Sequence, residues 1–128
     1  AAVDSYRNDP LCRAARRLAD DGVLVVAAAG NNGRTMSGRK VYGLIHTPGK
    51  TFDVPPAHER RVTDPTGCGD AFRAGLIFGI EKGCDWMTIG RIGNLMGALK
   101  VEHPGTQNQR FDYADFAEQF KQQFGYAL

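Results

Sequence analysis

The chain has 128 residues, of which 42% are hydrophobic, and a formal net charge of +2. This length suits one ordinary domain with a single core, and so small a charge argues against a nucleic-acid partner. No apolar run approaches the roughly 18 residues of a membrane span, and no secretory pattern opens the sequence. Three cysteines do not make a disulfide framework or a metal cluster. These features predict a cytoplasmic protein without a membrane or nucleic-acid partner.

The first predicted element is a helix over residues 10–21. Asp9 stands at the N-cap position, Pro10 takes the first helical position, and Gly22 follows the last turn. Apolar residues recur at helical spacing on one face of this segment. Three arginines take the other face, which we expect to be solvated and not a binding patch: Arg13, Arg16 and Arg17.

The next segment, residues 23–29, is apolar throughout and predicts a strand buried on both faces, as in a parallel sheet. The loop 30–33 then lies at the carboxyl end of this strand, where ligands bind in α/β sheets. Residues from about 4 to 49 resemble a segment of subtilisin-like serine proteases, chiefly through the runs 9–12, 21–33 and 46–49. In that family the residue matching Asn31 donates to the oxyanion. The sequence has no matching motifs for a nucleophile and its base, so no protease activity is expected.

A hairpin is predicted next. One strand begins at Gly38 and extends to 44, a turn covers 47–50, and a second strand covers 51–54. Pro55 and Pro56 end it, because neither can donate to a ladder. A short charged strand over 57–62 follows, with Arg60 and Arg61 expected to face solvent.

Residues 64–76 read Asp-Pro-Thr-Gly-Cys-Gly-Asp-Ala-Phe-Arg-Ala-Gly-Leu, a tight glycine turn that feeds a helix over 69–82. Gly67 and Gly69 let a ligand approach the main chain closely. The first N–H groups of a helix have no intrahelical partner and lie at its positive end, which suits a phosphate or an oxyanion. Asp70 stands at the same end and can accept a proton from a hydroxyl. An ordinary helix cap gives the same local pattern, so both interpretations stay open.

The whole run closely resembles the C-terminal signature of the PfkB (ribokinase-like) family of sugar and nucleoside kinases, and the resemblance covers about residues 51–128. It implies an anion hole made by Gly67, Cys68 and Gly69, with Asp70 as the general base; the family usually has Ala at the position of Cys68. It also implies ATP and Mg²⁺ as cofactors. The nucleotide-binding positions that the resemblance implies are Asn94, Gly97, Ala98, Gly105, Thr106 and Gln107, although close helix packing equally accounts for the glycine in the helix.

Three helices are expected in this part of the chain. The signature helix has its predicted core face at Phe72, Leu76, Ile77 and Ile80. Asp85 is predicted to cap a helix over 86–102, with a core face of Ile89, Ile92, Met96 and Leu99. Asp112 is predicted to cap the last helix, with Phe111 stapled to Phe116. The apolar stripe of that helix is Phe116, Phe120 and Phe124, and any part of it left bare would favour self-association into a homo-oligomer.

Together these elements predict an α/β fold: a small, mostly parallel sheet with a hairpin and about four helices, like the nucleotide-binding half of a ribokinase-like kinase. We expect residues 1–128 to form a single domain made of a protease-like piece, 1–50, and a kinase-like piece, 51–128. The favoured function is a truncated, chimeric ATP- or anion-binding part of a PfkB-type sugar or nucleoside kinase without full phosphotransferase activity. The alternative is a recombined, folded chimera with no ligand or catalytic function.

Overall fold

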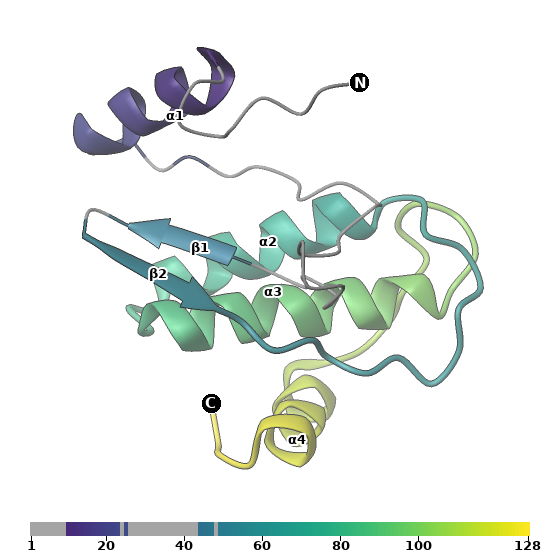
Figure 1. The fold of residues 1–128 in the computed structure, drawn as a ribbon. Coiled ribbons are helices and arrows are strands. Elements are labelled where there is room, and N and C mark those ends of the chain that lie inside the picture. The colour runs from purple at the N-terminus through teal and green to yellow at the C-terminus, as the bar shows by residue number, and fades with distance from the viewer. Residues whose placement is uncertain (1–9, 24, 26–43, 48) are drawn as a thin grey trace, which may run out of the picture.

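The computed structural model of the protein describes residues 10–23, 25, 44–47 and 49–128. Within these residues the chain forms α1 (Pro10–Asp20), β1 (Leu44–Thr47), β2 (Lys50–Asp53), α2 (Cys68–Glu81), α3 (Trp86–Val101) and α4 (Tyr113–Phe124), as Figure 1 shows. The predicted first helix is confirmed. Most of the predicted strand 23–29, the whole loop 30–33 and Asn31 lie outside the described residues. No helix in the described part is long and apolar enough to cross a membrane.

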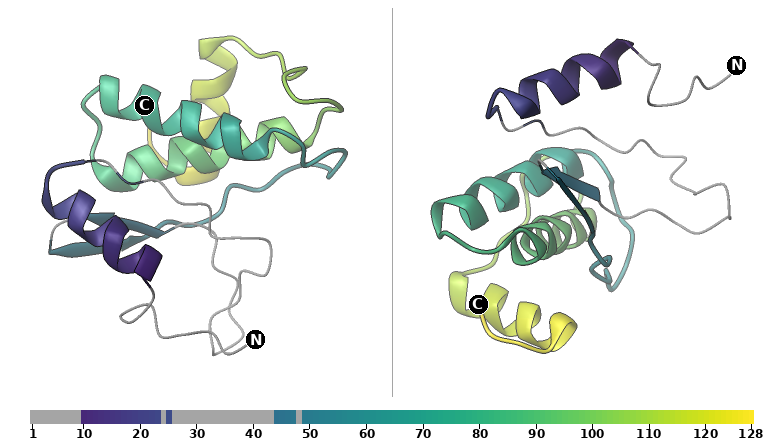
Figure 2. Two further views of the ribbon diagram at one scale, coloured as in Figure 1. Left: turned by 90° about the horizontal axis from the view of Figure 1, so that it is seen from above. Right: turned by 60° about the vertical axis from the view of Figure 1, so that its left-hand side comes forward.

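The centre of the structure is the antiparallel pair α2 and α3, which lie side by side in Figures 1 and 2. Two glycines allow this close approach: a Cβ placed on Gly75 would lie 2.9 Å from the Cα of Gly93. The predicted core face of α2 is therefore partly wrong. Leu76 is buried, but Ile77 is 60% exposed and Ile80 is 38% exposed. The buried residues of α2 are instead mostly small, and the glycines among them let the two backbones meet: Ala71, Gly75, Leu76 and Gly79.

The third helix, α3, carries the predicted cap and core. The Asp85 side chain accepts hydrogen bonds from the backbone N–H groups of Met87 and Thr88, at 2.9 and 3.1 Å. The same carboxylate accepts from the Thr88 hydroxyl, which also bonds to the Tyr126 hydroxyl at 2.8 Å. Three of the four predicted core residues of this helix, Ile89, Ile92 and Leu99, are buried, and Met96 is partly buried against the same core.

The last helix, α4, packs against α3, and its predicted cap is confirmed. Asp112 caps it by accepting from the backbone N–H of Asp115 at 2.8 Å, and the rings of Phe111 and Phe116 lie 5.6 Å apart across the cap. Phe116 and Phe120 are buried. These two rings are covered within the chain itself, so they do not supply the bare stripe on which self-association was predicted to depend.

The hairpin β1–β2 forms the sheet of the described region, and its strands are antiparallel with Thr47 opposite Lys50 and Leu44 opposite Asp53. The predicted turn is confirmed. The mostly parallel sheet is not found among the described residues, because its one predicted buried strand lies largely outside them. The hairpin meets α3 at another glycine: a Cβ on Gly90 would lie 2.6 Å from the nearest methyl carbon of Val54.

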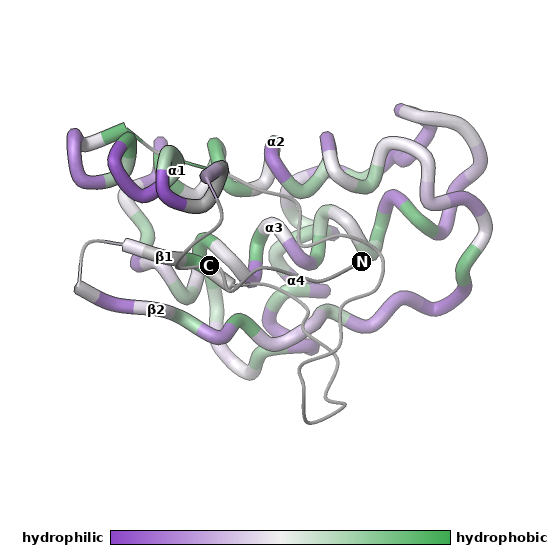
Figure 3. The backbone as a smooth tube through the Cα atoms, turned by 45° about the horizontal axis from the view of Figure 1, so that its top comes forward, coloured by the Kyte–Doolittle hydropathy of each residue, from purple (hydrophilic) through white to green (hydrophobic). Residues whose placement is uncertain are grey.

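The connection from β2 to α2 runs along α3 and is mostly hydrophilic, as Figure 3 shows. The strand predicted over 57–62 is not present there. Side chains satisfy the backbone of this segment in place of a neighbouring strand: Gln123 accepts from the His58 N–H at 2.7 Å and donates to the His58 carbonyl at 3.0 Å, and Glu102 accepts from the Arg60 N–H at 2.7 Å. The short charged strand predicted over 57–62 is therefore wrong, because side chains from α4 and from the end of α3 bond to this backbone.

Candidate functional site

The candidate site is built on the glycine turn before α2. Gly67 occupies the N-cap position with φ of 83°, a left-handed conformation that favours glycine, and no side chain caps the helix there. The Cys68 N–H donates to the Pro65 carbonyl at 3.1 Å. The next two amides, those of Gly69 and Asp70, have no partner among the described residues, as expected for the first turn of a helix. They remain available to an anion.

A second loop, residues 103–107, lies directly against this turn. A Cβ on Gly67 would stand 2.5 Å from the carbonyl oxygen of Thr106. The Gly105 N–H donates to Oδ2 of Asp64 at 2.8 Å, while Oδ1 of the same carboxylate accepts from the Thr66 N–H at 2.9 Å. Asp64 thus holds the turn with one oxygen and the loop with the other.

These hydrogen bonds change the acidity of Asp64. The bonds from Thr66, followed by the bond from Gly105 and the charge of Lys100, lower the pKa of the carboxyl from 3.8 to about 2. At neutral pH the group is a carboxylate that only accepts, which suits the two N–H donors facing it.

A buried cation lies beneath the two loops. Lys100 is fully buried, and its Nζ donates to the Asp64 carbonyl at 3.3 Å and to the His103 carbonyl at 2.9 Å. Sequence reasoning missed both Lys100 and the bridging role of Asp64. Lys100 falls in the last turn of a helix, where a lysine is ordinarily an exposed helix-end cation. Its different role becomes visible only in the structure, where its ammonium bonds to Asp64, 36 positions away in sequence.

The predicted base, Asp70, lies in the first turn of α2 and is exposed, with 78% of its side chain accessible. Its Oδ1 accepts from Nη1 of Arg73 at 2.8 Å, one helical turn away. The ion pair is exposed on both sides, so it holds the carboxylate only weakly. A hydroxyl brought to this helix start can therefore compete for it. Cys68, between the two glycines, is half-buried, and this burial raises the pKa of its thiol.

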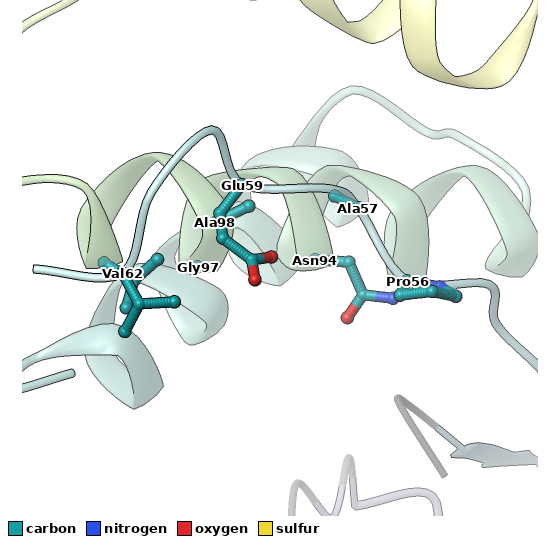
Figure 4. A pocket seen from close by; sticks show the side chains of 8 residues that line it. Pro56, Ala57, Glu59, Val62, Asn94, Gly97 and Ala98 are labelled. Carbon is teal, nitrogen blue, oxygen red and sulfur yellow. The ribbon is translucent and has the colours of Figure 1, made fainter. Parts of the chain in front are cut away.

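Three of the predicted nucleotide-binding residues, Asn94, Gly97 and Ala98, line one face of α3 and border a pocket of about 270 Å³. Figure 4 shows them facing the extended connection that supplies the opposite wall, formed by Pro56, Ala57, Glu59 and Val62. The Asn94 amide nitrogen donates to the Pro55 carbonyl at 2.7 Å. Asn94 thus has a structural task, which is to fix the wall of the pocket in which it lies.

The predicted site residues therefore fall into two adjoining groups. The turn and the second loop meet where Gly67 lies against Thr106 and where Asp64 accepts from Gly105, and the α3 residues line the pocket beside them. The two groups touch, since a Cβ on Gly97 would lie 3.7 Å from the Cys68 carbonyl. Within the described ranges no group of three or more His, Cys, Asp or Glu side chains could hold a metal ion.

Residues 20–112 match the model of the pfkB family of carbohydrate kinases. The chain belongs to this family. The match begins within the segment that resembles proteases and extends past residues 49–51, where a join between two pieces was predicted. None of the comparisons supports a protease-derived segment.

Similar proteins of the pfkB family include nucleoside kinases. The chain is 37% identical over 67 residues to a nucleoside kinase of Methanothermobacter thermautotrophicus, a match that covers 52% of this chain and 22% of that protein. It is 46% identical over 52 residues to an inositol 3-kinase of Arabidopsis thaliana, covering 41% of this chain and 14% of that protein. The chain thus spans about a fifth of the length of the curated nucleoside kinase that it matches.

Solved structures of pfkB-type kinases share the arrangement. The structure of Burkholderia thailandensis nucleoside kinase in complex with inosine matches with a TM-score of 0.67 and 46% identity, covering 70% of this chain and 30% of that one. The complex of the same kinase with ADP-inosine gives a TM-score of 0.66 and 47% identity, over 70% and 28% of the two chains. The ribokinase-like fold of the described part is therefore supported, although the hairpin is its only described sheet.

Proposed function

We propose that this chain is the nucleotide-binding region of a nucleoside kinase and that it binds ATP with its phosphates at the turn 67–70. One observation carries the proposal: the turn with free helix amides lies in contact with the 103–107 loop, so that two segments about 40 residues apart converge at the start of α2. Two unpartnered N–H groups at the positive end of a 14-residue helix suit a phosphate.

In this proposal the nucleotide base lies beside the phosphate site, in the pocket lined by Asn94, Gly97 and Ala98. The walls there are mainly apolar and small, which suits a flat ring, and Glu59 supplies a polar group at the rim. The Mg²⁺ that accompanies ATP would be held chiefly by the phosphates and by water, as is usual for this ion.

Asp70 is proposed as the general base of phosphoryl transfer in the complete kinase. Its carboxylate would take the proton of an acceptor hydroxyl, the hydroxyl oxygen would form a bond to the γ-phosphorus, and the bond from that phosphorus to the bridging oxygen would break to release ADP. The products are ADP, the phosphorylated acceptor and one proton. The likeness to the kinase solved with inosine supports a nucleoside as the acceptor.

The first test is a titration of the isotopically labelled chain with Mg-ATP, followed by amide chemical shifts. We expect saturable shifts at Gly67, Gly69, Asp70 and the 103–107 loop. A dispersed spectrum without shifts at millimolar nucleotide would overturn the proposal and favour a folded domain with no ligand.

A second test addresses Asp70. Asp70→Asn removes the base but keeps the shape, so we expect Mg-ATP affinity within about threefold of the unmodified chain, since the group and its ion pair are exposed. We expect the chain alone to bind ATP without steady transfer to inosine, because positioning of the acceptor supplies most of the rate. Steady transfer that Asp70→Asn abolishes would show that the chain carries the full catalytic machinery.

A further inference from the structure

Lys100 is a buried cation that makes no hydrogen bond to a carboxylate of the described residues. It is 0% exposed, and both described acceptors of its Nζ are main-chain carbonyls, those of Asp64 and His103. Burial of an ammonium group costs several kcal/mol unless its hydrogen bonds are satisfied, and an apolar side chain of similar size is often equally stable or more so. The lysine is therefore a poor choice for the core on grounds of stability alone.

The two carbonyls belong to the two loops of the candidate site. Asp64 immediately precedes the glycine turn, and His103 begins the loop whose Thr106 meets Gly67. A lysine near a helix end commonly donates to carbonyls at that end, and the bond to His103, just past the end of α3, is a local bond of this kind. The bond to the Asp64 carbonyl, 36 positions away in sequence, does not.

A second set of hydrogen bonds also holds the loops together. The Asp64 carboxylate accepts from the Gly105 N–H at 2.8 Å, and the backbone N–H groups of Thr63 and Asp64 donate to the Val101 carbonyl at 2.8 and 3.0 Å. The Lys100 ammonium lies under this set of bonds, and its charge favours the ionised state of Asp64. The one ammonium group therefore acts on both connections between the loops: it donates hydrogen bonds to their main-chain carbonyls, and its charge stabilises the Asp64 carboxylate.

We propose that Lys100 is a positioning residue of the nucleotide site, whose buried ammonium fixes the 103–107 loop against the 64–67 turn so that the phosphate-binding amides are held in place. The inference rests on the proposed function. Lys100 does not touch the nucleotide; it acts through the two carbonyls and through Asp64.

The test compares the unmodified chain with Lys100→Met, Lys100→Arg and the control Lys121→Met. Lys121 is an exposed lysine in the last turn of α4, so its change removes a charge from a helix that carries neither loop. Each variant is titrated with Mg-ATP and with inorganic tripolyphosphate, which has no base. Lys100→Met should weaken both affinities by at least about tenfold, because a hydrogen bond to a charged group contributes about 1.5–3 kcal/mol. Lys121→Met should weaken neither by more than about twofold.

Spectroscopic readouts separate positioning from a loss of fold. In Lys100→Met the Gly105 amide should exchange with solvent faster and the carboxyl of Asp64 should titrate at higher pH, while amides of α4 stay unchanged. In the unmodified chain the Lys100 ammonium should give a slowly exchanging ¹⁵N-bound proton signal at neutral pH, which exposed lysines do not give. That last measurement needs no variant to fold.

The outcomes distinguish the two proposals. Absence of Mg-ATP binding by the unmodified chain overturns the proposed function, whatever the variants do. Unchanged Gly105 exchange together with unchanged tripolyphosphate affinity in Lys100→Met overturns the positioning role, as does a fast-exchanging Lys100 ammonium in the unmodified chain. Lys100→Arg keeps the charge, so partial recovery of tripolyphosphate affinity is expected of it.

Discussion

The carbonyl oxygen of Thr106 lies so close to Gly67 that a Cβ on the glycine would stand 2.5 Å from it. Gly67 also has φ of 83°, which side chains rarely adopt. Glycine is therefore required twice at this position, once by the conformation of the turn and once by the loop that covers it. The two halves of the candidate site meet at a point where no side chain fits.

Gly67→Ala is expected to destabilise the protein by about 2–4 kcal/mol. About 1–2 kcal/mol comes from the left-handed conformation. The rest comes from displacement of the 103–107 loop, because the atoms that the new Cβ would meet belong to the backbone of Thr106 and cannot move aside as the end of a side chain can. Urea unfolding measures the loss, and Mg-ATP titration should show that nucleotide affinity falls with it.

Gly125→Ala is the matched control, because Gly125 has the same φ of 83° with nothing within 4 Å of its Cβ position. It should cost about 1–2 kcal/mol, from the left-handed conformation alone, and leave nucleotide affinity unchanged. Equal losses of stability in the two variants would contradict the contact between Gly67 and the Thr106 loop.

Acid should lower the free energy of unfolding of the protein, in part by protonating Asp64. Its folded pKa of about 2 lies below the ordinary 3.8, so the stabilisation is present above about pH 4 and is lost as the pH falls toward 2. The free energy of unfolding of the unmodified chain should therefore fall more steeply over that window than that of Asp64→Asn. Parallel curves for the two proteins would show that the carboxylate is not held by Thr66 and Gly105 in solution.

Gly75→Ala tests the close approach of α2 and α3. Its Cβ would lie 2.9 Å from the Cα of Gly93, so the helices must separate. We expect a net loss of about 1–2 kcal/mol, after the gain in helix propensity is subtracted from the cost of overpacking. Thermal unfolding measures it, and Gly69→Ala, with open space at its Cβ, should lose no stability.

Phe120→Ala should remove about 3–5 kcal/mol of stability, because the ring is fully buried between α3 and the chain end and lies 4.8 Å from the Phe124 ring. Tyr113→Ala in the same helix should cost less than about 1 kcal/mol, since Tyr113 is 58% exposed. Comparable losses in urea unfolding would mean that α4 does not dock through Phe120.

Local chemistry made the helix boundaries predictable. Asp85 and Asp112 cap helices because their carboxylates accept the free N–H groups of the first turn, a relation that needs only neighbours in sequence. The signature turn was predictable for the same reason, because a few consecutive residues determine both the left-handed conformation of Gly67 and the place of Asp70 in the first turn of α2.

Long-range packing was less predictable. Ile77 and Ile80 looked like core because they are apolar at helical spacing, yet the face with glycines is buried, since it alone permits backbone contact with Gly93. The backbone at 57–62 looked like a strand, but Gln123 and Glu102 bond to it from distant helices. Lys100 could not be predicted for the same reason, because no pattern in the neighbouring sequence indicates its hydrogen bond to the Asp64 carbonyl.

The glycine contact between α2 and α3 also bears on how a ligand would bind. The turn at the start of α2 and the loop after α3 are carried by two helices whose backbones touch at Gly75 and Gly93, so neither can shift without the other. A site of this kind is preorganised: its amides are oriented before the phosphate arrives, and little conformational entropy is lost on binding. Nucleotide association at this turn is then expected to be a docking step and not a closure, with little change in the backbone of the turn or of the 103–107 loop.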